Sequence, residues 1–304
     1  MGTARHATAG LCLRVGLDKT GIQHSEDWFR GRDGTRLFMQ TWEPHGPAKA
    51  VMLVIHGLFE HSGRYGNLVD YVVPRGFAVH SFDQRGHGRS EGLRGYVRRF
   101  SYYTDDLDIF RKLVSARHPA KPMFILGHSV GGTVVADYVS EHGRGFAGCI
   151  LSAATAMPGS SVTRSSILMA RALSAVLPKI GIASIDASAI SRDRKVVEAY
   201  LDDPLVYRGR IRARLGTELV NVIERSLPSK VADIEAPVLL IHGSQDRLSN
   251  TEGSSHLYAM ARSKDKTLKY YDGFYHELLN EPGHERVLAD IGDWLENHLR
   301  IGEE

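Results

Sequence analysis

Phe124-Ile125-Leu126-Gly127-His128-Ser129-Val130-Gly131-Gly132 joins two hydrophobic patterns that have different periods. The apolar run 123–126 predicts a short buried strand, and the apolar residues after Ser129 recur at the three-and-four spacing of a helix. A serine between Gly127 and Gly131 would therefore lie on a sharp strand-to-helix turn, where added side chains would clash with nearby backbone. The turn exposes the Ser129 hydroxyl and directs the first N–H groups of the helix toward a ligand. This pattern predicts a nucleophilic serine.

The composition is that of an ordinary globular protein. A chain of 304 residues, 42% hydrophobic and 24% charged, suits one large α/β domain with an insertion or two small domains. A net charge of +3 without aromatic residues interleaved among the basic ones argues against nucleic-acid binding. No run approaches the roughly 20 apolar residues of a membrane span. Cys12 and Cys149 are expected to be free thiols, and we expect a cytoplasmic location.

Strands and helices alternate along the chain on both sides of Ser129. A hairpin is expected around Asp33-Gly34, and the continuous apolar run 50–55 predicts a strand buried on both faces. Further strands are expected at 77–82, 147–151, 238–242 and 267–271. Such alternation predicts a mostly parallel central sheet with helices on both faces. The alternation stops between residues 153 and 227, where several helices are expected over the carboxyl ends of the strands.

The predicted organisation therefore has three parts. Residues 1–23 form a loosely ordered extension, residues 24–152 and 228–304 form the core, and residues 153–227 form a helical cap insertion.

Ser129 needs a base to activate it, and the base needs an orienting carboxylate, because serine hydroxyls are weak nucleophiles at neutral pH. Loops after the last two predicted strands contain Asp246 and His276. These complete the chain order Ser, Asp, His expected for this kind of sheet. Each residue alone could equally be an ordinary turn residue, but three at three strand ends predict a catalytic triad. Asp83 is a competitor for the acid role, which we interpret as a loop anchor.

The oxyanion formed during acyl transfer requires two N–H donors. One is the backbone N–H of Val130, directly after the nucleophile, and we assign the other to Leu58 in the loop after strand 50–55. Neither a His-Glu-x-x-His nor a Cys-x-x-Cys motif occurs, so no metal or other cofactor is predicted. His56 and His87 are expected to brace loops by hydrogen bonding.

These motifs resemble those of the α/β-hydrolases of the monoacylglycerol lipase and lysophospholipase group. The resemblance runs from about His24 to the C-terminus, and the string 56–65, His-Gly-x-x-Glu-His-Ser-Gly-Arg-Tyr, is its most specific part. It rests also on the segments 83–92, 127–132, 202–205, 243–248 and 275–276. The resemblance implies the α/β-hydrolase fold, the triad and the two oxyanion donors assigned above. It also implies that four side chains lie near the glycerol end of the pocket, namely Glu60, Arg64, His128 and Tyr200.

The predicted function is that of a serine hydrolase that cleaves carboxylic esters of long-chain acyl lipids, foremost monoacylglycerols, through an acyl-enzyme. The alternatives are a lysophospholipase, a short-chain or aromatic carboxylesterase, an acyltransferase, or a non-catalytic binding protein on the same fold. Residues 167–177 are apolar almost all round and have basic neighbours. They predict a helix in peripheral contact with a membrane, against the alternative of a core helix of the cap. No oligomeric state is assigned.

Overall fold

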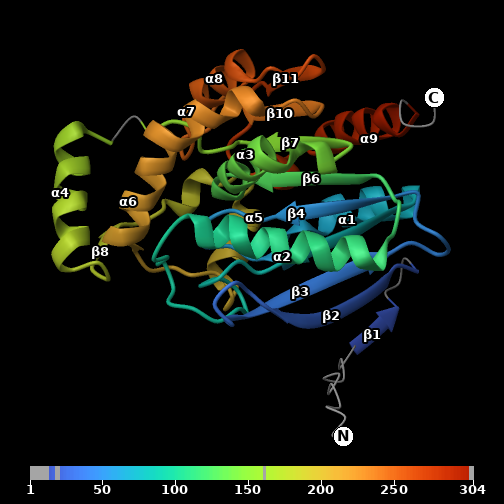
Figure 1. Cartoon of the computed structure of the whole chain (residues 1–304), viewed down its shortest axis with the longest axis horizontal. Helices are drawn as coiled ribbons and strands as arrows, with labels where there is room; N and C mark the ends of the chain where they lie inside the picture. Colours follow the sequence, from blue (N-terminus) through green and yellow to red (C-terminus); the bar gives the residue numbers. More distant parts are fainter. Residues whose placement is uncertain (1–13, 18–20, 160–161, 301–304) are drawn as a thin grey trace, which may run out of the picture.

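A nine-stranded sheet forms the centre of the computed structural model, which describes residues 14–17, 21–159 and 162–300 (Figure 1). Its strand order is β1-β2-β3-β5-β4-β6-β7-β10-β11. The strands from β5 to β11 in this order are parallel, and β1, β2 and β3 join antiparallel. Their bounds are β1 Arg14–Leu17, β2 Gln23–Arg30, β3 Arg36–Glu43, β4 Ala50–Ile55, β5 Phe77–Phe82, β6 Met123–His128, β7 Gly148–Ser152, β10 Val238–Gly243 and β11 Lys266–Tyr271.

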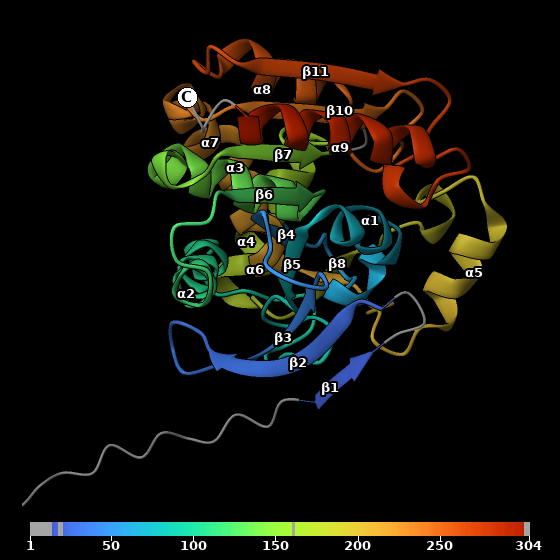
Figure 2. The same ribbon diagram turned by 90° about the vertical axis from the view of Figure 1, so that its right-hand side faces the viewer.

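Helices cover both faces of the sheet, which confirms the predicted fold class (Figure 2). One face packs against α1 and α9, and the other packs against α2, α3 and α8. The helices of these two layers are α1 Gly66–Val72, α2 Ser101–Arg117, α3 Val130–His142, α8 Glu252–Met260 and α9 Glu285–Arg300.

The central strands are buried throughout because successive side chains point to opposite layers, each covered by helices. In β4, Val51 and Leu53 belong to the cluster that contains residues of α2 and α3, whereas Met52 and Val54 belong to the cluster of α1 and α9. All six residues of β4 are fully buried. The continuous apolar run 50–55 is therefore a strand enclosed on both faces, whereas β11, at the end of the sheet, is only part buried.

The segment between β7 and β10 leaves the sheet and forms helices beside it (Figure 1). These are α4 Arg164–Val176, α5 Arg194–Asp202, α6 Ala213–Asn221 and α7 Leu227–Lys230. The segment also contains two short strands that the sequence did not predict, β8 Gly181–Ala183 and β9 Ile211–Arg212. They pair with each other apart from the main sheet. No helix of the described residues is long and apolar enough to cross a membrane.

Within the extension expected over residues 1–23, the structure describes one further strand. Arg14–Leu17 forms strand β1, which pairs antiparallel with the first residues of β2. The physical reason is that β2 would otherwise be an edge strand with unpaired N–H and C=O groups. Residues 1–13 and 18–20 lie outside the described residues.

The close approach of α3 to β4 predicts a measurable stability effect. A Cβ atom at Gly131 would lie 2.3 Å from the carbonyl oxygens of Ile55 and His56, which are rigid backbone atoms. We expect Gly131→Ala to lower the free energy of unfolding by about 1–3 kcal/mol, the usual result of overpacking. Urea unfolding followed by circular dichroism would measure this change.

Gly66→Ala is the matched control, because a Cβ at Gly66 would meet no atom within 4 Å. Its urea midpoint should equal or exceed that of the wild type. Equal midpoints for Gly131→Ala and the wild type would contradict the steric argument.

Candidate active site

Ser129 lies on the turn between β6 and α3 in a strained backbone conformation. Its φ of 54° and ψ of −123° fall in a region that residues other than glycine rarely adopt. The turn is held on one side by the Ser129 N–H, which donates to the carbonyl of Ser152 at 2.9 Å. It is held on the other side by Gly127 and Gly131, since a Cβ on either would meet backbone within 2.5 Å. The surrounding contacts thus fix the position of the Ser129 hydroxyl.

Asp246 follows β10 and its carboxylate is saturated with hydrogen bonds. Its Oδ2 lies 2.7 Å from Nδ1 of His276 and 3.0 Å from Nε2 of His242. Its Oδ1 accepts the backbone N–H groups of Leu248, at 2.7 Å, and Ser249, at 3.0 Å. Burial acts to raise the pKa of Asp246, but the histidines and these bonds outweigh it and hold the pKa well below its usual range. The side chain is therefore a fixed, ionised partner for His276.

His276 follows β11 and is buried beside Asp246. Burial alone would lower the pKa of this imidazole, but the charge of Asp246 and the hydrogen bond between them raise it above the ordinary 6.5. Because Nδ1 faces Asp246, Nε2 is the nitrogen left to exchange a proton with a neighbouring hydroxyl. Ser129 and His276 line the same cavity, and the Ser129 hydroxyl makes no hydrogen bond to a described residue. The geometry suits a nucleophile, a base and an orienting acid in that order.

Asp83, the competing acid, is engaged elsewhere. Its Oδ1 accepts the N–H of Ser62 at 2.8 Å and the hydroxyl of the same residue at 2.6 Å. Its Oδ2 accepts the N–H of Arg89 at 2.7 Å. These bonds tie together the loops that follow β4 and β5, as expected of a loop anchor.

His56 and His87 are also tied to these loops. His56 accepts the N–H of Gln84 through Nε2 at 2.8 Å, and Nδ1 of His87 lies 3.0 Å from the carbonyl of Arg85. Burial lowers the pKa of each imidazole to about 3, so both rings stay neutral. They brace the loops in the way that the sequence predicts.

Leu58 and Val130 both line the cavity beside Ser129. Their backbone N–H groups have no acceptor among the described residues. The loop that carries Leu58 is fixed by the N–H of Gly57, which donates to Oε1 of Glu60 at 2.5 Å. Two unpaired N–H groups beside a nucleophile can receive a developing oxyanion.

The four residues expected at the polar end of the pocket are brought close together, but only three of them line the cavity. Glu60, His128 and Tyr200 line the cavity, whereas Arg64 is not among its described lining residues. Arg64 packs behind it, with its guanidinium 4.9 Å from the ring of Tyr200. Burial, and the charge of the nearby Glu277, raise the pKa of Glu60. Burial also lowers the pKa of His128 well below 6.5, so this ring is neutral beside His276.

Sequence reasoning missed two residues of this site. Glu277 lines the cavity and binds Arg64 through Oε2 at 2.6 Å, and its only sequence signal is its place after His276. His242 is fully buried near the end of β10. Its Nδ1 lies 2.7 Å from the hydroxyl of Ser254, and its Nε2 contacts Asp246. Its signal is a histidine four residues before the acid, at the end of the same strand.

The cavity has a volume of about 550 Å³, within the range of small-molecule sites. Ser129, His276 and Glu60 contribute polar groups to its wall, as do Asp186 and Arg247. Most of its remaining wall is apolar and comes from the inserted segment, including Ile167, Met169, Leu173, Ile182, Ile211, Leu219 and Ile223. Such a site accepts a ligand with one polar end and a long apolar part.

Comparison with known proteins gives consistent matches over most of the chain. Residues 46–283 match the Hydrolase_4 family model, described as serine aminopeptidase, S33. A monoacylglycerol lipase of Mycolicibacterium smegmatis is 35% identical over 275 residues, which cover 90% of this chain and 98% of the relative. Human monoglyceride lipase is 37% identical over 269 residues, which cover 86% of this chain and 88% of the relative. The crystal structure of a monoacylglycerol lipase from Paleococcus ferrophilus matches with a TM-score of 0.79 and 30% identity. The match covers 86% of this chain and 99% of that chain.

The contact between Asp246 and His276 predicts how the imidazole titrates. Because the carboxylate stabilises the protonated ring, we expect a His276 midpoint above pH 6.5 in the wild type. Asp246→Asn removes the charge and should move this midpoint to lower pH. Histidine side-chain NMR over a pH series, assigned with a His276→Gln variant, would measure both values.

His128 provides an internal control within the same spectra. Its pKa lies well below 6.5 because the ring is buried beside His276, so its resonances should not move near neutral pH. A His276 midpoint below 6.5, unchanged by Asp246→Asn, would contradict the assigned pairing.

Proposed function

Because this chain belongs to the Hydrolase_4 family of α/β-hydrolases, we propose that it is a serine hydrolase that cleaves long-chain monoacylglycerols to fatty acid and glycerol. The observation that carries the proposal is the cavity, in which Ser129 and His276 adjoin a largely apolar wall. The monoacylglycerol lipases of M. smegmatis and P. ferrophilus support the substrate class, since each matches this chain over nearly its whole length.

The proposed reaction follows from the positions of these groups. Ser129 attacks the ester carbonyl while His276 accepts the hydroxyl proton through Nε2 and passes it to the glycerol leaving group. Asp246 holds the imidazole in the required tautomer through Nδ1, at 2.7 Å. The N–H groups of Leu58 and Val130 stabilise the oxyanion, and each such donor is typically worth about 10²–10³ in kcat. Water then hydrolyses the acyl-enzyme through the same base.

The glycerol end of the substrate is assigned to the polar end of the cavity. Glu60, His128 and Tyr200 would face its hydroxyl groups there. Arg64 acts from behind, because its guanidinium lies 2.6 Å from Glu277 and 3.4 Å from Glu60 and so holds both carboxylates in place. This modifies the predicted role of Arg64 from a contact residue to a positioning residue.

The charge at this end separates the first candidate from a lysophospholipase. Two carboxylates, Glu60 and Glu277, line the cavity, and the single guanidinium of Arg64 is paired with both. The guanidinium of Arg64 is thus already paired and is not free to bind a phosphate headgroup, whereas glycerol hydroxyls can donate hydrogen bonds to the carboxyl oxygens. The site therefore favours a neutral headgroup.

The nucleophile assignment is tested with a substrate panel. The wild type should hydrolyse 1-oleoylglycerol faster than p-nitrophenyl acetate and faster than oleoyl-lysophosphatidylglycerol, a lysophospholipid with an anionic headgroup, and should be labelled by a fluorophosphonate probe. Ser129→Ala should lose labelling and all three activities while its circular dichroism spectrum is unchanged, because a small side chain fits the turn.

Ser255→Ala on α8 is the matched control, since Ser255 is exposed and outside the cavity, and it should behave as the wild type. Turnover by a purified, folded Ser129→Ala enzyme would refute the assignment. A preference for the lysophospholipid would refute the headgroup argument alone.

The insertion 153–227 is assigned as a cap that admits the acyl chain from a membrane surface. Helix α4 has two apolar faces with different surroundings. Ile167 and Leu173 line the cavity, whereas Leu168 and Val176 are 64% and 78% exposed to solvent. The segment 167–177, expected to be apolar almost all round, thus has one side that faces the cavity and another side that faces solvent. An exposed apolar patch on a folded protein favours contact with another surface.

The charges near α4 also fit a peripheral lipid contact. Arg164 and Lys179 are exposed at the two ends of the helix and could face anionic lipid. Arg171 contributes less, because it pairs with Glu224 at 3.3 Å.

The membrane proposal is tested on the outer face of α4 alone. Each buried side chain of this size contributes about 1.5–3 kcal/mol, so Leu168→Asp with Val176→Asp should weaken vesicle binding at least about tenfold. Activity on vesicle-borne monoacylglycerol should fall, while p-nitrophenyl acetate hydrolysis should be unchanged. Vesicle co-sedimentation and the two assays measure these effects.

Leu113→Asp on α2 is the control, because Leu113 is 39% exposed on a helix that packs on the sheet rather than in the cap. It should bind vesicles as the wild type does. A folded double variant with unchanged vesicle binding would end the membrane proposal.

A further inference from the structure

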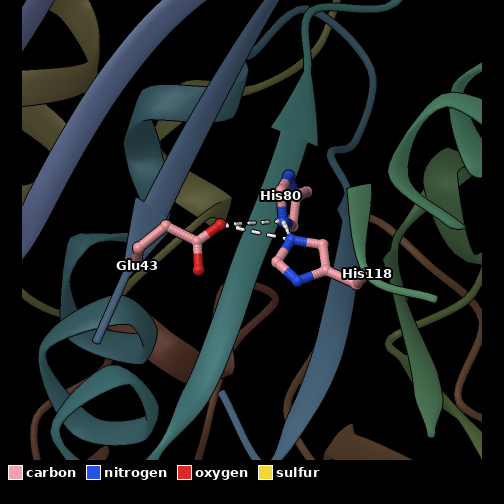
Figure 3. A group of neighbouring side chains, drawn as sticks. All are labelled: Glu43, His80 and His118. Atoms are coloured by element: carbon pink, nitrogen blue, oxygen red, sulfur yellow. Dashed lines mark hydrogen bonds and ion pairs between the residues drawn. The ribbon is translucent and has the colours of Figure 1, made fainter. Parts of the chain in front are cut away.

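Three potential metal ligands meet at a place far from the catalytic cavity. Glu43 ends β3, His80 lies in β5, and His118 directly follows α2 (Figure 3). β3 runs antiparallel to β5, and the segment after α2 leads to the start of β6. Glu43 and His118 therefore lie at the edge where the parallel strands begin, opposite the edge that carries Ser129. None of the three lines the cavity.

Their ligand atoms form a small triangle. Nε2 of His80 lies 2.9 Å from Nε2 of His118, and Oε1 of Glu43 lies 3.2 Å from the latter and 3.5 Å from the former. Bonds of about 2.0–2.2 Å to a tetrahedral Zn²⁺ place two ligand atoms roughly 3.3 Å apart. An ion at that bond length from all three atoms would lie about 1 Å out of their plane, close to tetrahedral geometry. Two imidazoles and one carboxylate are a common ligand set for zinc.

The electrostatic environment suits a divalent cation. Burial lowers the pKa of His80 below 6.5, so that ring is neutral and its nitrogen can ligate. Burial opposes ionisation of Glu43, but hydrogen bonds from His118 and His80 outweigh it and lower the pKa of Glu43 to about 2. His118 caps the C-terminus of α2, where the helix dipole favours positive charge. Arg117, the neighbouring cation, is itself paired with Asp27 at 3.2 Å.

The second ring nitrogen of His80 is also held, as in many metal sites. Nδ1 lies 3.1 Å from the hydroxyl of Thr41, which is directly opposite His80 in the β3–β5 register. Such a contact fixes the tautomer that presents Nε2 to a metal. Thr41 and Glu43 are two residues apart and so share one face of β3, the face that meets His80. Strand pairing alone thus assembles two ligands and the supporting hydroxyl.

We propose that Glu43, His80 and His118 bind one divalent transition-metal ion, with Zn²⁺ as the first candidate. A solvent molecule would occupy the fourth coordination position. Solvent can reach the site because the Glu43 side chain is 31% exposed. The bound ion would tie the end of α2 to β3 and β5 and so stabilise this edge of the sheet. No closely spaced metal-binding motif in the sequence indicates this site, because the three ligands come from three separate elements. The predicted lack of a metal rested on the absence of such motifs and on the scatter of the histidines, His80 among them, along the sequence.

The test is direct metal binding by the full chain, without an affinity tag and after treatment with EDTA. Titration calorimetry with Zn²⁺, and metal analysis after dialysis, should give one bound ion per chain. One equivalent of Zn²⁺ should also raise the Tm of the wild type, since a ligand that binds the folded state stabilises it. Glu43→Gln should keep the hydrogen-bonded cluster but lose at least about nine-tenths of the bound metal and the rise in Tm.

Two further variants make the test specific. Thr41→Val removes only the supporting hydroxyl and should weaken Zn²⁺ binding about 10–100-fold. His256→Ala removes an exposed imidazole elsewhere and should bind one ion as the wild type does. Circular dichroism before metal addition checks that each variant is folded. The proposal is overturned if the wild type binds no stoichiometric Zn²⁺, or if folded Glu43→Gln and Thr41→Val bind it as tightly as the wild type.

Discussion

The strained backbone at Ser129 is the constraint on which the rest of the site depends. A left-handed conformation at a serine costs free energy and persists only where several contacts hold it. Here the N–H of Ser129 donates to Ser152, and its carbonyl accepts the N–H groups of Thr133 and Thr155. The turn thus joins β6, β7, α3 and the start of the insertion. Because Gly131 lies directly against the end of β4, the loop that carries Leu58 is brought beside the same serine.

Charge inside the site is arranged as two buried networks. In the first, Asp246 accepts hydrogen bonds from two histidines and two backbone N–H groups. In the second, Arg64 joins Glu60 and Glu277, and Glu60 also accepts the hydroxyl of Tyr65 at 2.9 Å. Buried charges are costly unless they are paired and fully bonded, and a satisfied network then holds its members in one geometry. The Asp246 network meets this condition, whereas Nε of Arg64 in the second network is buried without a hydrogen-bond partner among the described residues.

The two edges of the sheet differ in character. At the carboxyl edge the strands end in loops that carry the candidate catalytic groups, and the inserted helices supply an apolar wall. At the opposite edge, Glu43, His80 and His118 connect β3 and β5 to the end of α2. The first arrangement leaves space for a substrate, whereas in the second the side chains contact one another and connect neighbouring elements. The two lie at opposite edges because the parallel strands all point the same way, whereas β3 runs antiparallel to β5 and so ends near the start of that strand.

The local pattern of the sequence determined the elements themselves. Apolar runs such as 50–55 and 77–82 coincide with β4 and β5, and the change of period at Ser129 places the turn, because side-chain periodicity depends only on nearby residues. The tertiary structure decided what depends on distant residues. The contact of Asp246 with His276 is already expected from the order of residues at the strand ends, whereas the structure alone placed Arg64 behind Glu60. The structure also gave α4 an inner and an outer face, paired β1 with β2, and assembled the Glu43, His80 and His118 cluster. The contact of Arg64 with Glu277 and the cluster of Glu43, His80 and His118 join segments far apart in the chain, so no local pattern encodes them.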